Sequence, residues 1–334
     1  MPQSSSSPSD YIVPESELSQ DHPQYEQLSF AHLWFAFERD FDVRPTTYFL
    51  RTYYWPSVVA ISAVYLLGIV VGQWLMADRP PFQLRTPLKL WNWALAVFSV
   101  LGAWRQSVEF VYVYQQRGFM GTACTVSLAH SMVAFWAEKF AFSKVVELGD
   151  TAFLVLRKRP VTFLHWFHHV TVLAYTWHAV RDHTVAGRWF IWMNYSVHAI
   201  MYTYYALMSG GGRRAPKIVS ATITTLQIAQ MFVGCYVAYF VYRVKTTPGR
   251  YCHQTWQNIY MAFAMYATYM ALFLRYFYLA YIRKRPQQQP QPQLAGAEKE
   301  KQLELQRRQK LVNVPNGFVR NGAAVQANGK MHAE

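Results

Sequence analysis

Long apolar segments separated by short polar stretches recur along most of the chain. Seven of these segments are about twenty residues long, which is enough for a helix to cross a hydrocarbon core of about 30 Å. They span residues 54–76, 90–114, 132–156, 163–180, 189–208, 218–242 and 256–282. Hydropathy supports the third segment least, because it contains five charged side chains: Glu138, Lys139, Lys144, Glu147 and Asp150. The pattern predicts an all-α membrane protein with seven transmembrane helices.

Composition agrees with this prediction and divides the chain into three parts. Hydrophobic residues make up 52% of the 334 residues and charged residues 15%, against about 25% charged in an ordinary soluble domain. We expect a disordered lead at 1–29, a membrane domain at 30–285 and a disordered basic tail at 286–334. No cleavable signal peptide is visible, so the first transmembrane segment is expected to direct insertion.

The formal net charge of +14 is concentrated in the loops and the tail. Basic loops beside membrane spans mark the cytosolic side, so this charge does not predict a nucleic-acid partner. The loop bias favours an outer N-terminus, and this orientation places the polar clusters of segments three to six in the inner half of the membrane. They can build one site if their helices pack together. Arg105 and Glu109 in segment two are an exception, and their spacing of four predicts that they pair with each other.

Three histidines at the start of the fourth segment are the main candidates for chemistry. His165, His168 and His169 are spaced i, i+3 and i+4, which places them on one face of a helix. Ionisable side chains inside a bilayer are costly and therefore predict a functional site; a polar patch that ties helices together is the plainer alternative. Imidazoles often bind metals, but membrane di-iron oxygenases need several such boxes and this chain has one. We therefore predict no metal site, and acid–base or acyl-imidazole chemistry remains.

The three cysteines suit the role of an acyl-carrying nucleophile poorly. Cys235 stands alone in the sixth segment, without a polar partner nearby in sequence. Cys124 and Cys252 both fall in predicted outer loops, where an oxidising compartment favours a structural disulfide between them.

The fifth segment carries a polar and aromatic stripe that contains Asn194, His198, Met201, Tyr202 and Tyr205. His198 can act as a base or as a second ligand. The hydroxyls of Tyr202 and Tyr205 can donate to a developing oxyanion. An aromatic packing stripe is the alternative, and we keep that interpretation for Met201 and Tyr204.

Two further clusters repeat a spacing of three residues. In the first, Lys144 and Glu147 can pair, which lowers the cost of burying both, and Asp150 can hold an imidazole in one tautomer. A helix end that reaches to the membrane interface is the alternative. The second cluster offers uncharged donors and acceptors for a carbonyl or an amide, or only for bonds across helices: Thr224, Gln227 and Gln230.

Together these clusters resemble the fatty acid elongase family, the membrane 3-ketoacyl-CoA synthases of the endoplasmic reticulum. The matching strings are KVVELGDT at 144–151, HWFHH at 165–169, NYSVHAIMYTYY at 194–205 and TTLQIAQ at 224–230. Four motifs in this order and spacing are highly specific, and the resemblance covers about residues 30–285. Trp166, Pro160 and the segment 81–91 are similar to the branch that acts on saturated and monounsaturated acyl chains. No Asn precedes the first segment, so the family's N-terminal glycosylation acceptor is missing.

The resemblance implies a fold in which six of seven helices enclose a narrow acyl tunnel. It implies that a long-chain acyl-CoA and malonyl-CoA condense to 3-ketoacyl-CoA, carbon dioxide and free CoA, with coenzyme A thioesters as substrates and no bound cofactor. His168 is the expected acyl carrier, and His165 and His169 are expected to position it or to move protons. His198 and nearby tyrosines are expected to steady the enolate of malonyl-CoA.

The resemblance also implies an endoplasmic reticulum membrane protein with a lumenal N-terminus and a cytosolic C-terminus. Expected partners are membrane lipid, the ketoacyl reductase, dehydratase and enoyl reductase of the elongation cycle, and a second copy in a homodimer. A membrane di-iron desaturase or hydroxylase is the nearest enzyme alternative, and a seven-helix receptor or transporter is the non-enzyme alternative. The sequence does not place the side chains that close the outer end of the tunnel, so it does not fix chain length.

Overall fold

The structure is helical throughout the residues that it describes, which confirms the predicted all-α class. This computed structural model describes residues 35–125, 132–209, 216–283 and 300–308 and contains no strand within them. The chain divides into a helical body that ends at Arg283 and a C-terminal part that begins at Lys284, and each is described by itself. In the C-terminal part, residues 300–308 form an exposed helix. The predicted lead and the rest of the predicted tail lie outside the described residues.

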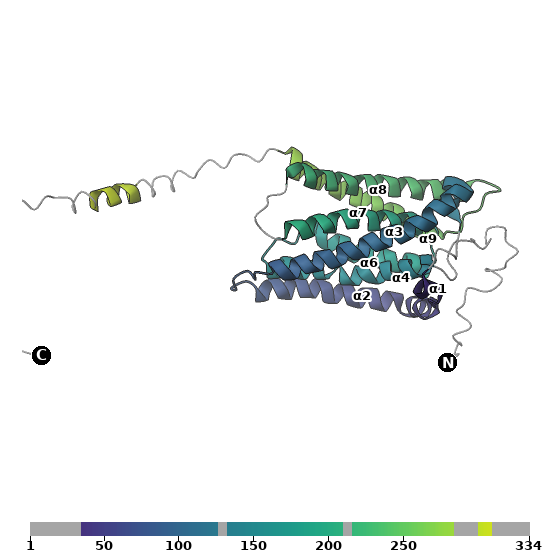
Figure 1. Cartoon of the computed structure of the whole chain (residues 1–334), viewed down its shortest axis with the longest axis horizontal. Helices are drawn as coiled ribbons and strands as arrows, with labels where there is room; N and C mark the ends of the chain where they lie inside the picture. The colour runs from purple at the N-terminus through teal and green to yellow at the C-terminus, as the bar shows by residue number, and fades with distance from the viewer. Residues whose placement is uncertain (1–34, 126–131, 210–215, 284–299, 309–334) are drawn as a thin grey trace, which may run out of the picture. The chain divides into compact units, whose positions relative to one another are not determined.

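Six of the seven predicted segments each contain one α-helix of the body, and the third contains two (Figure 1). The helices are α1 (Ala36–Arg39), α2 (Arg44–Leu75), α3 (Arg85–Cys124), α4 (Met132–Val146), α5 (Gly149–Leu156), α6 (Phe163–Arg181), α7 (Gly187–Met208), α8 (Lys217–Thr246) and α9 (Trp256–Phe277). The third predicted segment is divided into α4 and α5. The seventh ends in a π-helical turn, Tyr278–Ile282.

Local sequence signals set several helix ends. The hydroxyl of Thr162 accepts a hydrogen bond from the backbone N–H of His165 at the start of α6. At the start of α9, the hydroxyl of Thr255 accepts one from the backbone N–H of Asn258. Threonine is a favoured N-cap because its oxygen satisfies one of the free N–H groups of the first turn. Helix α3 is interrupted at Gly118, whose φ of 62° lies in the left-handed region that glycine adopts without strain.

Helices α2 and α8 are long and apolar enough, over the described residues, to cross a membrane. Most of the apolar window of α2 is unburied within the protein. Val64, Leu67, Val70 and Trp74 each expose more than half of their surface. An apolar face of this size, directed away from the core, fits contact with lipid tails better than contact with water.

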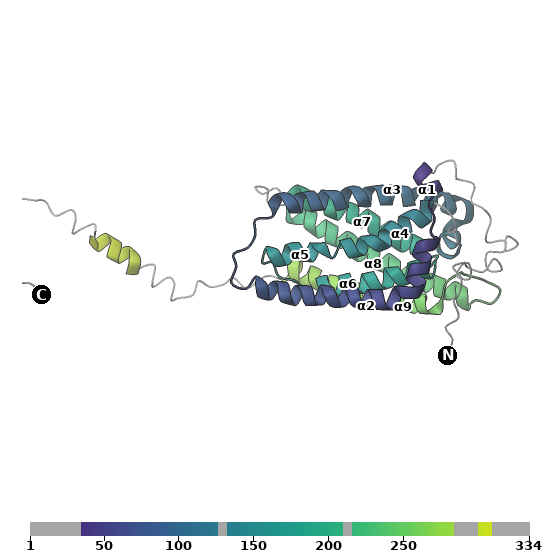
Figure 2. The same ribbon diagram turned by 90° about the horizontal axis from the view of Figure 1, so that it is seen from below.

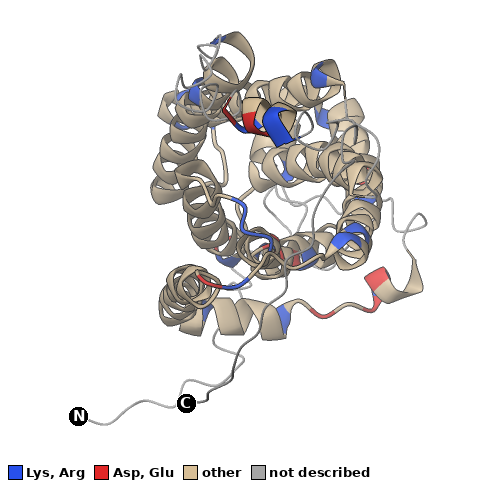
Figure 3. Ribbon diagram, turned by 90° about the vertical axis from the view of Figure 1, so that its left-hand side faces the viewer, with Lys and Arg blue, Asp and Glu red and all other residues tan. Residues whose placement is uncertain are grey.

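The long helices pack lengthwise around a common axis (Figures 2 and 3). Helix α3 packs against α7, α8 against α9, and α6 against both α2 and α4. The close approach of α3 to α7 depends on Gly102, because a Cβ atom there would overlap the ring of Tyr195. Helix α4, which packs against α6, is also linked to α7 by a hydrogen bond from Lys144 to Asn194. The predicted polar clusters of these three helices therefore lie near one another.

Two buried ion pairs tie α3 to other helices, and they differ from the predicted pair of Arg105 and Glu109. Arg105 instead donates to Glu38 of α1, with Nε–Oε1 at 2.8 Å. Trp136 of α4 donates to the same oxygen at 2.7 Å. Glu109 instead accepts from Arg188 of α7 at 2.8 Å. The prediction of an intrahelical pair was wrong because each side chain meets a buried opposite charge on another helix.

The predicted disulfide between Cys124 and Cys252 is present and joins the end of α3 to the loop between α8 and α9. Cys235, on α8, is a free and partly buried thiol. Cys124, Cys252 and Ala179 belong to one core cluster. Ala179 lies at the end of α6, whereas the histidines lie at its start. The disulfide is therefore near the end of α6 that is distant from the histidines.

Candidate active site

The three predicted histidines form one cluster in the first turns of α6. The ring centroids of His165 and His169 are 4.5 Å apart, and those of His168 and His169 are 5.5 Å apart. His169 is buried, and its Nδ1 atom has no hydrogen-bond partner among the described residues. The fold therefore places the three imidazoles on one face, as the spacing predicts.

His165 is fixed by a hydrogen-bonded chain that reaches two other helices. Its Nε2 atom lies 2.8 Å from the hydroxyl of Thr151 on α5. That hydroxyl lies 2.8 Å from the hydroxyl of Tyr65 on α2. The chain of Tyr65, Thr151 and His165 orients the imidazole and offers it a route for a proton.

His168 differs from its two neighbours because it faces a cavity. No hydrogen bond from its ring nitrogens to another described residue is formed. The ring of Tyr269 on α9 lies 5.0 Å away between centroids. The Tyr269 hydroxyl bonds Thr171 at 2.6 Å and the backbone oxygen of His168 at 3.3 Å. These contacts hold the turn that carries His168 and leave its ring available to a substrate.

A second polar network joins α4 to α7 beside the histidines. Lys144 donates to Glu147 at 2.7 Å, as predicted, and to Oδ1 of Asn194 at 2.9 Å. The Asn194 amide nitrogen lies 3.2 Å from Nε2 of His198. The amide nitrogen can only donate, so Nε2 of a neutral His198 is the acceptor. His198 Nδ1 lies 3.8 Å from Glu147. The four side chains form a closed ring of polar contacts that fixes the orientation of His198.

Asp150 does not hold an imidazole, contrary to the prediction. Its two oxygens accept from Trp91 of α3 at 2.6 Å and from the hydroxyl of Tyr202 at 2.8 Å. The Tyr202 proton is therefore directed at Asp150, and the same hydroxyl cannot also donate to an oxyanion unless this bond breaks. Tyr205 retains 44% exposure. The role of Tyr205 as an oxyanion donor therefore stays a prediction, and for Tyr202 it would require the bond to Asp150 to break.

The third predicted cluster, on α8, divides between two environments. Gln227 donates to the sulfur of Met201 at 3.4 Å, and Thr224 lies 3.4 Å from the hydroxyl of Tyr281. Both side chains therefore bond across helices. Gln230 is buried and lines the same cavity as His168.

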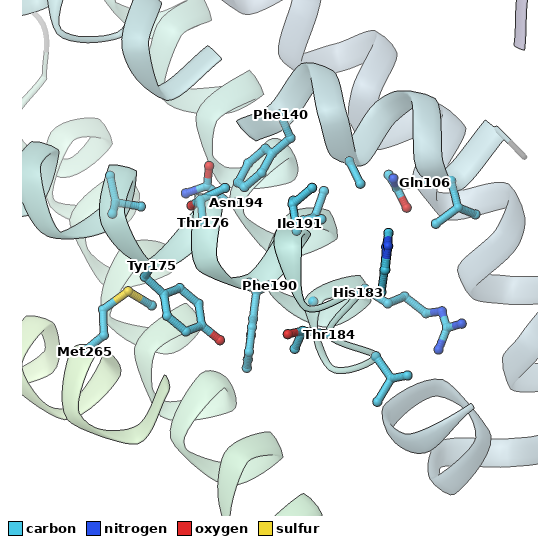
Figure 4. A pocket seen from close by; sticks show the side chains of 18 of the residues that line it. Gln106, Phe140, Tyr175, Thr176, His183, Thr184, Phe190, Ile191, Asn194 and Met265 are labelled. Carbon is cyan, nitrogen blue, oxygen red and sulfur yellow. The ribbon is translucent and has the colours of Figure 1, made fainter. Parts of the chain in front are cut away.

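The cavity is enclosed by residues of six helices, α3, α4, α6, α7, α8 and α9, and is shown in Figure 4. His168, Asn194 and Gln230 are its polar residues near the histidine cluster. Most of the wall beyond them is apolar or aromatic and includes Ala137, Phe140, Val172, Phe190, Ile191 and Met265. An elongated apolar cavity beside a cluster of imidazoles suits a long hydrocarbon chain with a reactive group at one end.

Sequence reasoning missed three aromatic residues that hold the polar groups. Trp91 donates to Asp150, and the Tyr269 hydroxyl donates to the backbone oxygen of His168. Tyr65 bonds Thr151, the partner of His165. The apolar rings of these three aromatic residues lie within apolar segments, where nothing in the spacing separates them from packing residues. Within the described part of the chain, no three His, Cys, Asp or Glu side chains are grouped so that they could hold a metal ion.

Comparison with known proteins identifies the family. Residues 49–289 match the family described as ELO, GNS1/SUR4 family. The chain is 48% identical over 265 residues to "Putative fatty acid elongase 3" of Caenorhabditis elegans, which covers 79% of this chain and 82% of that protein.

Two mammalian proteins are similar over most of their length. Very long chain fatty acid elongase 3 of Homo sapiens is 43% identical over 252 residues, covering 75% of this chain and 91% of the human protein. Very long chain fatty acid elongase 6 of Mus musculus is 40% identical over 251 residues, covering 75% and 93%. The chain therefore belongs to the ELO family and is an enzyme of fatty acid elongation.

Proposed function

We propose that the protein is a 3-ketoacyl-CoA synthase that condenses a saturated or monounsaturated long-chain acyl-CoA with malonyl-CoA through an acyl-imidazole on His168. The observation that carries this proposal is the position of His168. Among the three clustered histidines it is the one that lines the apolar cavity. A nucleophile at the end of an apolar cavity can meet the thioester carbonyl while the hydrocarbon chain fills the cavity.

In the first step, the unprotonated ring nitrogen of His168 attacks the thioester carbonyl. The carbon–sulfur bond breaks, and the CoA thiolate takes the proton that the imidazole releases. The His165–Thr151 contact at 2.8 Å lies one turn away and supplies groups that can accept and return a proton. An acyl-imidazole is a reactive acyl donor, so free CoA can leave before the second substrate enters.

In the second step, malonyl-CoA loses carbon dioxide and becomes an enolate. The enolate carbon attacks the acyl carbon on His168, the carbon–nitrogen bond breaks, and the leaving imidazole takes up from water the one proton that the overall condensation consumes. Asn194 lines the cavity beside His168 and is held by Lys144 at 2.9 Å. Asn194 has a second amide hydrogen besides the one directed at His198, and it is the donor that we assign to the developing negative charge; such a donor is typically worth about 3–4 kcal/mol. His198 acts through Asn194, whose amide it orients.

The same proposal includes seven membrane-crossing helical segments in the endoplasmic reticulum, with the disulfide on the lumenal side. Disulfides persist in the oxidising lumen rather than in the cytosol. The Cys124–Cys252 bond therefore supports a lumenal position for the end of α3, and a cytosolic position for the start of α6, where CoA thioesters are available. In this arrangement the cavity is an acyl tunnel that runs from the cytosolic half toward the lumen.

The test is to trap the acyl group. The purified full-length protein is incubated with a radiolabelled palmitoyl-CoA without malonyl-CoA, and the labelled peptide is identified by mass spectrometry. We expect one acyl group on the peptide that contains 165–169, none in His168→Ala, and an unchanged yield in Cys235→Ser. Release of free CoA before malonyl-CoA is added, and ping-pong initial-rate patterns, are expected for the same reason.

The outcomes separate the covalent mechanism from the overall reaction. Malonyl-CoA-dependent 3-ketoacyl-CoA without a labelled peptide, or with label on Cys235, would contradict the acyl-imidazole and leave the condensation standing. No 3-ketoacyl-CoA from any acyl-CoA between 12 and 22 carbons would contradict the proposed reaction itself.

A further inference from the structure

The end of the cavity that is distant from His168 is polar, although the wall between is mostly apolar. His168 and Val180 both line the cavity and are twelve residues apart on α6, which corresponds to about 18 Å along the helix axis. Beyond Val180 the lining changes in character. The lining here combines five polar residues, Gln106, Thr125, His183, Thr184 and Arg188, with Val43, Val185 and Gly187.

Gln106 is the most unusual of these residues, because its amide is buried and has no partner. Gln106 is 1% exposed, and neither its Nε2 nor its Oε1 atom forms a hydrogen bond with a described residue. The Thr184 hydroxyl oxygen is also buried without a partner. Buried polar groups are nearly always paired, and each exception requires an explanation. Here the unpaired groups lie where the end of a bound chain would be.

His183 adds a third polar group to this end. It lies in the loop between α6 and α7, lines the cavity, and in Figure 4 its ring points toward the same part of the cavity as the Gln106 amide. Burial, and then the nearby positive charge of Arg51 and His253, lower the pKa of His183 to about 4. At neutral pH the ring is therefore uncharged and presents one donor and one acceptor.

We propose that this polar end binds a hydroxyl group at the far end of the acyl chain, so that the protein elongates ω-hydroxy acyl-CoA substrates. The inference rests on the proposed function, in which His168 takes the other end of the chain. A hydroxyl can donate to Oε1 of Gln106 and accept from Nε2 at the same time, and Thr184 or His183 can supply a further bond. A terminal methyl group leaves the Gln106 amide unpaired. A site whose buried polar groups bond a substrate hydroxyl therefore discriminates against a substrate that lacks this hydroxyl.

The test compares matched pairs of substrates. Chains of 12, 14, 16 and 18 carbons, each with a methyl end or an ω-hydroxyl end, are offered as CoA thioesters with malonyl-CoA. The measurement is kcat/KM for the wild type, Gln106→Met, Thr184→Val and Ile191→Val. Met has nearly the shape of Gln and removes an unpaired buried amide, so Gln106→Met is expected to unfold at or above the wild-type temperature.

We expect the ω-hydroxy substrate to be elongated at least as efficiently as its methyl counterpart at one or more of these lengths. Gln106→Met is expected to lower the ratio of hydroxy to methyl efficiency about tenfold, the usual effect of losing one buried hydrogen bond to a substrate. Thr184→Val is expected to lower it less. Ile191→Val changes the same cavity without changing a polar group, so the ratio is expected to stay at the wild-type value.

Two results would overturn this inference and leave the proposed condensation reaction standing. The first is a preference of tenfold or more for the methyl substrate at every length. The second is a Gln106→Met variant with the wild-type ratio. Either result would mean that the polar groups only hold water, which buried polar cavities commonly do. If neither kind of substrate is extended, the proposed function fails and this inference fails with it.

Discussion

Arg188 and Glu109 form a buried ion pair between α7 and α3, and removing either partner should destabilise the protein to a different extent. Arg188 Nε lies 2.8 and 2.9 Å from the two Glu109 oxygens. The guanidinium also donates to the backbone oxygens of Thr122 at 2.6 Å and Thr125 at 3.1 Å. Glu109 is 0% exposed and Arg188 5%. Arg188, in the first turn of α7, thus contacts both the middle of α3 at Glu109 and its C-terminal end.

The magnitude follows from what each substitution leaves behind. Arg188→Leu leaves a fully buried carboxylate without its cation and removes the donor to three backbone oxygens, those of Gly121, Thr122 and Thr125. Breaking a buried pair in this way costs about 3–5 kcal/mol. Glu109→Leu leaves Arg188 with its backbone acceptors at the end of α3, so the cost of this substitution is expected near the lower limit of that range. The double variant removes both charges together, and apolar replacement of a whole buried pair is often close to neutral.

The assay is the thermal unfolding midpoint of the purified proteins in one detergent, at one scan rate, because unfolding of such proteins is often irreversible. For Arg188→Leu we expect a midpoint about 6–20 °C lower, from about 2–4 °C per kcal/mol for a domain of this size. The double variant is expected to lie above Arg188→Leu. A double variant whose loss equals the sum of the two single losses would refute the coupling, and with it the explanation of why Arg105 and Glu109 do not pair.

Two further predictions concern the helix interface and the loop histidine. Gly234→Ala is expected to cost about 1–3 kcal/mol, because the new Cβ atom would overlap the Tyr266 ring; Gly68→Ala, with no atom within 4 Å, is the control and should leave the unfolding midpoint unchanged or higher. A loss no larger in Gly234→Ala than in the control would contradict the close packing. Since the folded-state pKa of His183 is about 4, below the ordinary value of about 6.5, its contribution to stability is complete above pH 6.5 and is lost as pH falls toward 4, by about 2 kcal/mol between pH 7.5 and 5. Unfolding midpoints measured across this range should fall less steeply in His183→Asn, which cannot titrate and tolerates the left-handed backbone of this residue, and equal slopes would refute the assignment.

The positions of the helices could be predicted from the sequence because hydropathy reports burial or lipid contact directly. The break inside the third segment could not, since hydropathy averages over it. Gly149 begins α5, and a Cβ atom there would lie 2.7 Å from the Trp91 ring. The break allows Glu147 to remain on the Lys144 side while Asp150 meets a different helix. That choice depends on which helix lies opposite, and a single sequence does not contain it.

The clusters were predictable as clusters, and the partner of each side chain was not. Spacing along one helix predicted that Lys144 would bond Glu147, and this pair is confirmed at 2.7 Å. It also predicted a partner for Asp150, and that assignment was wrong. Local pairs compete with pairs between helices, and in a buried site the bond that satisfies the most donors prevails. Tyr202 and Trp91 both need an acceptor in an apolar region, and Asp150 provides two oxygens.

The division of labour among the three clustered histidines is a property of the fold alone. In the sequence they differ only by position within two turns. His165 has its Nε2 atom on Thr151, and attack by that nitrogen would first require this bond to break. His169 is buried with an unpaired Nδ1, so an acyl chain cannot reach it without moving its neighbours. His168 alone of the three lines the cavity. Acyl transfer therefore needs the least rearrangement at His168, and the other two imidazoles are better suited to hold it and to move its proton.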